Sequence, residues 1–192
     1  MARPKAFDRE TALMGAIPVF CDHGYDGTST EMLLGAMGIS RQSMYDTFGD
    51  KRRLYLEALR QYVAGSVSEQ IGLLHGAASP LKGVEAMFDA MAVRFGSADE
   101  PGCLGINAIC EFGRADAEVA MLTDTAGRML HSALEARLAA AKAAGEIGHD
   151  VDVRAAAQFL GATLAGLKLS GRGGASAETL RGIARMALRS LR

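Results

Sequence analysis

Residues 38–55 read GISRQSMYDTFGDKRRLY, a segment with too many polar and charged side chains to form a core. Ser40 is expected to cap a helix, because a serine hydroxyl accepts a hydrogen bond from a backbone N–H of the first turn. At about 100° per residue, Met44 and Phe48 share one side of that helix. The other side is polar and is expected to face solvent; it carries Arg41, Gln42, Tyr45 and Asp46.

The preceding segment, GTSTEMLLGAMG at residues 27–38, predicts a second short helix. Thr28 or Ser29 can cap its start, and Gly38 can end it. Two short helices joined by a glycine-containing turn form a helix-turn-helix, whose second helix enters the major groove of DNA. Spacing alone also allows a short helix with a solvated polar face.

The side chains of the second helix suit base recognition. Arginine can donate two hydrogen bonds to guanine and glutamine can pair with adenine, so Arg41 and Gln42 are candidate base readers. Ser43 and the hydroxyl of Tyr45 can reach phosphates or base edges.

Hydroxyls and cations flank this polar helix. Thr28 and Ser29 precede it, and Lys51 and Arg52 open the next helix, for which Asp50 is the expected cap. Cations in a first turn oppose the helix dipole, and this unfavourable placement indicates an anionic partner such as a phosphate.

Composition limits the class of protein. The chain has 192 residues, of which 49% are hydrophobic, enough for one globular unit or for a small domain joined to a larger one. Three cysteines are too few for a disulfide framework, and the N-terminal MARPKAFDRE lacks the apolar stretch of a signal peptide, so we expect a cytoplasmic protein. No apolar run reaches the roughly 18 to 20 residues that cross a bilayer. The net charge of −1 leaves nucleic-acid binding open, because the positions of the cations decide it.

Apolar residues recur at helical spacing, and no alternating β-branched stretch predicts a strand, so the expected fold class is all-α. Pro18 is expected to kink or loosen the first helix, which runs from Asp8 to about His23. Further helices are expected at about residues 50–75, from Ser79-Pro80 to the loop GSADEPG, and at 103–114, 116–144, 152–170 and 176–191. Together these later helices form a bundle.

Residues 24–59, GYDGTSTEMLLGAMGISRQSMYDTFGDKRRLYLEAL, resemble the DNA-binding domain of the TetR family of bacterial transcriptional regulators. The resemblance implies an all-α homodimer of about nine helices. It implies a helix-turn-helix DNA-binding domain over residues 1–50 and a helical ligand-binding and dimerisation domain over residues 51–192.

The resemblance also implies roles for single residues toward double-stranded operator DNA. Tyr45 and Lys51 would lie at phosphates, as would Thr28 or Ser29. Arg41, Gln42 and Ser43 would point towards bases.

Two late helices carry apolar stripes that one chain does not obviously cover. We expect a two-fold four-helix interface between two copies, and the alternative is an ordinary intramolecular core. The stripes consist of Phe159, Leu160, Thr163, Leu164 and Leu167, and of Leu180, Ile183, Ala184, Ala187, Leu188 and Leu191.

A ligand cavity is expected among the central helices. Its apolar walls would come from Phe88, Met91, Phe95, Phe112, Met121 and Met129. The polar candidates are Asn107, Glu111 and Arg114, although the last two could equally form a surface pair.

Cys103 follows Pro101-Gly102 near an expected helix start, where the helix dipole stabilises a thiolate. Some TetR-like repressors with a similar Gly-Cys-Leu stretch sense electrophiles or oxidants, so the resemblance allows redox sensing here; burial as an inert small side chain is the alternative. Cys110 lies about 10 Å further along a helix, too far for a disulfide within it.

Together these features predict a DNA-binding transcriptional regulator, a repressor released by a small-molecule inducer or by cysteine modification. The alternative is a helical dimeric ligand-binding or scaffold protein without specific DNA recognition. The four histidines are scattered without metal-ligand spacing, and no strand precedes a glycine-rich phosphate loop. We therefore expect no enzymatic activity, no metal and no cofactor.

Overall fold

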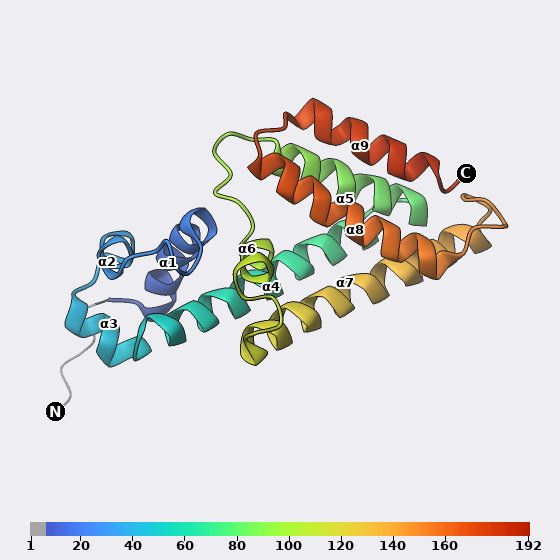
Figure 1. Ribbon diagram of the computed structural model, residues 1–192. Coiled ribbons are helices and arrows are strands. Elements are labelled where there is room, and N and C mark those ends of the chain that lie inside the picture. The colour runs from blue at the N-terminus through green and yellow to red at the C-terminus, as the bar shows by residue number, and fades with distance from the viewer. Residues whose placement is uncertain (1–6) are drawn as a thin grey trace. The chain divides into compact units, whose positions relative to one another are not determined.

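The computed structural model describes residues 7–192, and within them the chain forms nine α-helices and no strand (Figure 1). This arrangement confirms the all-α prediction. The remaining residues, part of the N-terminal stretch in which we expect no signal peptide, lie outside the described range. The helices are α1 (Arg9–His23), α2 (Thr30–Met37), α3 (Arg41–Phe48), α4 (Lys51–His75), α5 (Pro80–Phe95), α6 (Leu104–Phe112), α7 (Ala117–Ala143), α8 (Val153–Arg172) and α9 (Ala177–Arg189).

The helices belong to two compact units. Unit 1 holds the chain up to Ala64 together with Cys103–Thr123, and unit 2 holds Gly65–Gly102 and Asp124–Arg192. α6 thus packs against α1, although 86 residues separate its Asn107 from Cys21 in sequence. This division concerns packing, and the functional boundary at residues 50–51 stays a prediction.

Side-chain caps explain where the helices begin. The hydroxyl of Ser40 accepts the backbone N–H of Ser43 at 3.1 Å, as predicted for the start of α3. Asp8, Ser29, Ser79, Asp152 and Ser176 cap α1, α2, α5, α8 and α9 in the same way. Gly38 ends α2 in the left-handed region, with φ 65° and ψ 30°, and so makes the tight turn into α3.

The core of unit 1 fixes the angle between the first helices. Phe20, Leu33 and Met44 are fully buried, one from each of α1, α2 and α3. α1 and α2 approach so closely that a Cβ on Gly15 would lie 2.7 Å from the carbonyl oxygen of Ala36. α1 is continuous through the exposed Pro18, so the proline does not end the helix.

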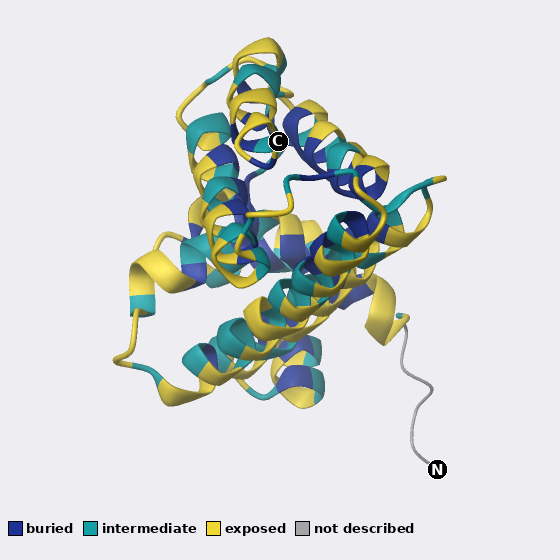
Figure 2. Cartoon of the chain, turned by 90° about the vertical axis from the view of Figure 1, so that its right-hand side faces the viewer, coloured by how far each residue is buried: buried dark blue, intermediate teal, exposed yellow. Residues whose placement is uncertain are grey.

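Unit 2 contains α5, α8 and α9 side by side, and Figure 2 shows their buried stripes facing inward. A Cβ on Gly171 of α8 would collide with the carbonyl oxygen of Phe95 at the end of α5, so only glycine permits this approach. Leu164 is 2% exposed and Ala187 is 4% exposed within the single chain. The expectation that Leu164 lies at an interface between copies is therefore wrong, because its own chain already buries it. Ala187 lines a groove between α8 and α9, and its place at an interface stays a prediction.

Within residues 7–192, none of the helices is both long enough and apolar enough to cross a bilayer.

Candidate nucleic-acid interface

The outer face of α3 carries the polar arc that the sequence predicts. Arg41, Gln42 and Tyr45 are exposed, and the Tyr45 ring keeps 43% of its surface accessible. Met44 and Phe48, on the opposite side, are buried in unit 1. Gly38 and the Ser40 cap hold α3 directly behind α2, so the polar arc stands on a rigid support.

The two candidate base readers have partners within the chain. The Arg41 guanidinium pairs with the Glu31 carboxylate on α2, and Gln42 Nε2 donates to Asp46 Oδ1 at 2.7 Å. The pKa of Glu31 lies below its usual value because its own backbone N–H and the Arg41 guanidinium stabilise the carboxylate. Both contacts are exposed, so a base edge can replace them at little cost in free energy.

The hydroxyls at the start of α2 differ in access. The Thr28 side chain is 1% exposed, and its hydroxyl donates to the carbonyl oxygen of Gly24. Ser29 is exposed and caps α2 through the backbone N–H of Met32 at 3.2 Å. Of the two alternatives, only Ser29 can present its hydroxyl to a phosphate. Ser43 is half-buried, and its hydroxyl accepts from Ser40 Oγ at 3.0 Å.

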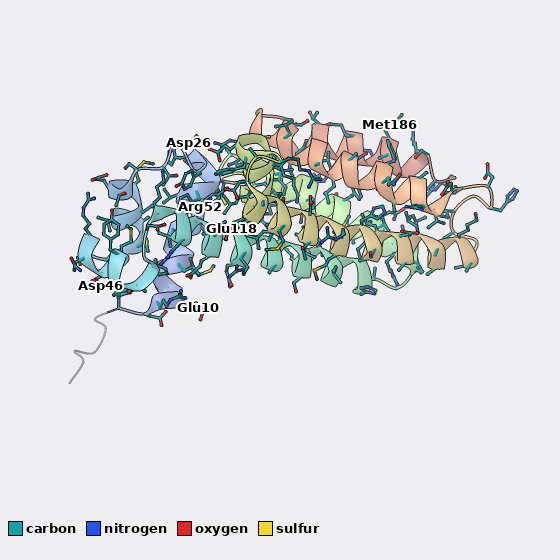
Figure 3. The ribbon with its side chains drawn as sticks, turned by 60° about the horizontal axis from the view of Figure 1, so that its bottom comes forward. Glu10, Asp26, Asp46, Arg52, Glu118 and Met186 are labelled. Carbon is teal, nitrogen blue, oxygen red and sulfur yellow. The ribbon has the colours of Figure 1, made fainter. Side chains whose placement is uncertain are left out.

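The cations at the start of α4 also differ. Lys51 Nζ lies 4.4 Å from the centre of the Tyr25 ring, an arrangement that holds an ammonium without neutralising it. Arg52 instead pairs with the carboxylates of Asp116 and Glu118, so the anionic partners that its place in the first turn indicates lie within the chain (Figure 3). The Arg53 side chain is 75% exposed and lies 3.9 Å from Asp50. Arg53 is therefore an accessible cation in this turn, although the sequence pattern gives it no specific role.

α6 braces the turn between α1 and α2. Asn107 Nδ2 donates to the carbonyl oxygen of Cys21 at 2.8 Å. The Glu111 carboxylate accepts the backbone N–H of Tyr25 at 2.9 Å and that of Asp26 at 3.3 Å. A carboxylate near a helix C-terminus interacts unfavourably with the helix dipole. This unfavourable position of Glu111 is the feature of the sequence that could have predicted a specific hydrogen-bond partner for its side chain.

The predicted ligand residues fall into two groups. Phe88 and Met91 are buried in unit 2, whereas Cys103, Asn107 and Phe112 belong to unit 1. One shared cavity therefore stays a prediction.

Within unit 1, the Phe112 ring lies 5.6 Å from the rings of both Tyr25 and Tyr55, so it helps to hold the α1–α2 turn. Burial raises the pKa of Tyr55. Met121 and Met129 are 60% and 54% exposed, so the expectation that they line an enclosed cavity is wrong.

Cys103 occupies the N-cap position of α6, as the sequence predicts, and is 7% exposed. Cys110 is exposed. No group of three His, Cys, Asp or Glu side chains in the described chain is arranged to hold a metal ion.

Two short helices joined at Gly38, with an exposed arginine, glutamine and tyrosine on the second, define a helix-turn-helix protein of the DNA-binding class. Two family models match this chain: the model of bacterial regulatory proteins of the tetR family over residues 13–58, and the tetracyclin repressor-like C-terminal domain over residues 80–186. The chain belongs to the TetR family of transcriptional regulators.

Individual relatives agree with this assignment. The chain is 33% identical to the HTH-type transcriptional repressor ComR of Escherichia coli, covering 97% of this chain and 90% of ComR. It is 35% identical to the uncharacterized HTH-type transcriptional regulator YezE of Bacillus subtilis, covering 83% and 84% of the two chains. A cysteine mutant of the TetR family regulator CifR, complexed with 26-bp double-strand operator DNA, superimposes with a TM-score of 0.87 at 31% identity, over 99% of this chain and all of that one.

The Arg52–Asp116 ion pair predicts a pH dependence of stability. The Arg52 guanidinium and the backbone N–H of Val119 lower the pKa of Asp116 below its ordinary value of 3.8. A depressed folded-state pKa contributes stability above the ordinary value, and that contribution is lost as the pH falls through the folded-state value. We expect Asp116→Asn to be less stable than wild type at pH 7, with a difference that shrinks below about pH 4.

Urea denaturation at a series of pH values, at one protein concentration, measures this difference. Asp99→Asn is the matched control, because Asp99 is an exposed carboxylate in a loop. A constant difference between Asp116→Asn and wild type across the series would contradict the assignment.

Proposed function

We propose that the chain is a homodimeric repressor that binds operator DNA in the cytoplasm by inserting α3 into the major groove. The observation that carries this proposal is the exposed polar arc of α3, held on a buried base by Met44 and Phe48. Accessible phosphate ligands stand on both sides of it, Ser29 before α2 and Lys51 at the start of α4. The ComR and CifR comparisons support the same function.

Each contact has a defined role in this proposal. Arg41 and Gln42 leave Glu31 and Asp46 to bond base edges, and Ser43 lies beside them on the first turn of α3. Tyr45, Ser29 and Lys51 bond phosphates and set the register of α3 in the groove. Thr28 supports this surface from inside, since its hydroxyl fixes the turn before α2.

Base-reading and phosphate-binding residues should respond differently to substitution. Arg41→Ala or Gln42→Ala should cost about 1 to 3 kcal/mol at the cognate site and reduce discrimination among sequences. Lys51→Ala should weaken binding to all DNA and flatten the dependence of log affinity on log salt by about one unit. Gel shifts with DNA from upstream of the protein's own gene, at several salt concentrations, measure both effects.

Equal behaviour of the two kinds of variant would reject these roles. If wild type binds cognate and scrambled DNA equally, the alternative of a helical ligand-binding or scaffold protein without specific recognition is favoured.

The dimer interface in this proposal is the apolar flank of α8 and α9 that the single chain leaves uncovered. Phe159 is 48% exposed, Ile183 is 39% exposed and Met186 is 65% exposed, and the groove between the two helices also includes Thr163 and Thr179. Figure 3 marks Met186 on the outer side of α9. A two-fold axis beside this groove would pack α8 and α9 of one copy on the same helices of the other.

A charge on this flank should separate the subunits without unfolding them. Met186→Asp should shift sedimentation from dimer to monomer and lower specific DNA affinity, because paired α3 helices read half-sites about one helical turn, or a multiple of it, apart. Leu164→Asp is the contrast, since a buried unpaired charge should destabilise the fold itself. A wild-type protein that is monomeric at micromolar concentration and still binds one half-site tightly would exclude the dimer.

Release from DNA is proposed to follow a small-molecule inducer or modification of Cys103. Cys103 is enclosed at the N-cap position directly before α6, the helix whose Asn107 and Glu111 hold the α1–α2 turn. A bulky adduct on Sγ cannot fit the closed packing and would displace α6. Full reversal from bound to free requires a preference for the open state of about 5 kcal/mol.

Cys103→Ser should bind DNA like wild type and lose release by quinones, aldehydes or hypochlorite, whereas Cys110→Ser should still be released. Gel shifts with increasing reagent, together with mass spectrometry of the modified residue, measure this. If the Cys103→Ser variant were released from DNA at the same reagent concentrations as wild type, Cys103 would be an inert core residue. A reversible small-molecule inducer would then remain as the trigger.

A further inference from the structure

A groove of about 400 Å³ lies between α5 and α9 in unit 2. Phe88, a wall of the ligand cavity that the sequence predicts, also lines this groove. The volume of the groove falls within the range of small-molecule sites, about 300 to 1,000 Å³. α5 and α9 run side by side in Figure 1.

The groove carries more positive than negative charge. Four arginines line it, Arg181, Arg185, Arg189 and Arg192, against the two carboxylates Glu85 and Asp89. The periodicity of α9 places Arg181, Arg185 and Arg189 on one arc of the helix, and Arg192 follows the helix end.

Only two of the four arginines are neutralised. Arg181 Nε bonds Asp89 Oδ1 at 2.9 Å, and Arg192 lies 3.7 Å from Glu85 Oε1. Glu85 also pairs with Lys82 at 2.7 Å, so its single negative charge is shared between two cations. Within residues 7–192, the Arg185 and Arg189 guanidinium groups form no hydrogen bond or ion pair.

A solvated charged face explains many helices, but it does not explain this spacing. Arg181, Arg185 and Arg189 follow one another at i, i+4, where like charges destabilise a helix. An anion between the last two would remove that repulsion, and guanidinium groups bind carboxylates through paired, charge-assisted hydrogen bonds.

The wall beside the arginines is apolar. Phe88 is fully buried at the groove, Ala184 is 4% exposed and Leu188 is half-buried. A small, fully hydrated anion would leave this apolar wall exposed to water. An anion attached to an apolar group would bury the wall and gain the free energy of removing apolar surface from water.

We propose that the groove between α5 and α9 binds a small amphipathic carboxylate. Arg185 and Arg189 hold the carboxylate, and Leu188 is the accessible apolar side chain that contacts its apolar body. The site does not require that the chain bind DNA, so its test is independent of the function proposed above.

Isothermal titration of the full-length protein with octanoate, and with octanamide as its uncharged match, tests the site. Wild type should bind octanoate saturably, one per chain, and octanamide about tenfold or more weakly, because a charge-assisted hydrogen bond contributes about 1.5 to 3 kcal/mol. Arg185→Gln and Arg189→Gln should each weaken octanoate binding by about tenfold or more. Arg154→Gln, at an exposed arginine on α8, should bind octanoate like wild type.

Thermal midpoints without octanoate show whether each variant keeps its fold. Absence of saturable octanoate binding, equal affinity for octanamide, or undiminished octanoate binding by folded Arg185→Gln and Arg189→Gln would each overturn the proposal.

Discussion

The Glu111 carboxylate and the two backbone N–H groups that it accepts, from Tyr25 and Asp26, form the contact on which the DNA-binding surface depends. These N–H groups lie in the turn after α1, where no helical carbonyl is available to them. A carboxylate satisfies both at once, and a charge-assisted hydrogen bond is about twice as strong as a neutral one. A Cβ on Gly24 would occupy the position of the Glu111 carboxylate, so the glycine is required there.

The N-cap Cys103 and two residues of α6, Asn107 and Glu111, follow one another at i, i+4 spacing and so lie on one face. The second bonds the last turn of α1 and the third bonds the turn that follows it. The first is enclosed at the helix start. Any displacement of α6 that begins at Cys103 therefore acts on the same face that positions α1 and α2, and through Gly38 it acts on α3.

Much of this fold is predictable from local chemistry, because caps and glycines act within a few residues. Ser40 and Gly38 define α3 and the turn before it without knowledge of the rest of the chain. Local chemistry does not show which of Thr28 and Ser29 is accessible, because either residue can cap a helix. Thr28 is buried only by the packing of the turn between α1 and α2. Arg52 is likewise undetermined locally, since its partners Asp116 and Glu118 lie more than sixty residues away.

The functions of the three faces of α9 also cannot be predicted from its local sequence. The sequence shows the apolar stripe of Leu180, Ala184 and Ala187, but not that α5 and α8 of the same chain bury it. The flank of Ile183 and Met186 becomes distinct only after that stripe is covered. The arginine flank becomes distinct only when α5 supplies enough carboxylates for two of its four guanidinium groups.

The acidic partners of Arg41 and Gln42, Glu31 on α2 and Asp46 on α3, bear on specificity. Glu31 and Asp46 hold Arg41 and Gln42 in free protein, and their carboxylates repel DNA phosphates. On nonspecific DNA no base edge would accept or donate hydrogen bonds to Arg41 or Gln42. These side chains would then gain no binding free energy by breaking their contacts with Glu31 and Asp46, and the two carboxylates would still repel the phosphate backbone. In the base-reading role proposed above for Arg41 and Gln42, the base edges of a matching site would replace both partners, and hydrogen bonds that only that sequence offers would offset the repulsion. A chain with net charge −1 cannot rely on bulk attraction to DNA, so the proposed function assigns this discrimination to the few cations and amides on α3 and at the start of α4.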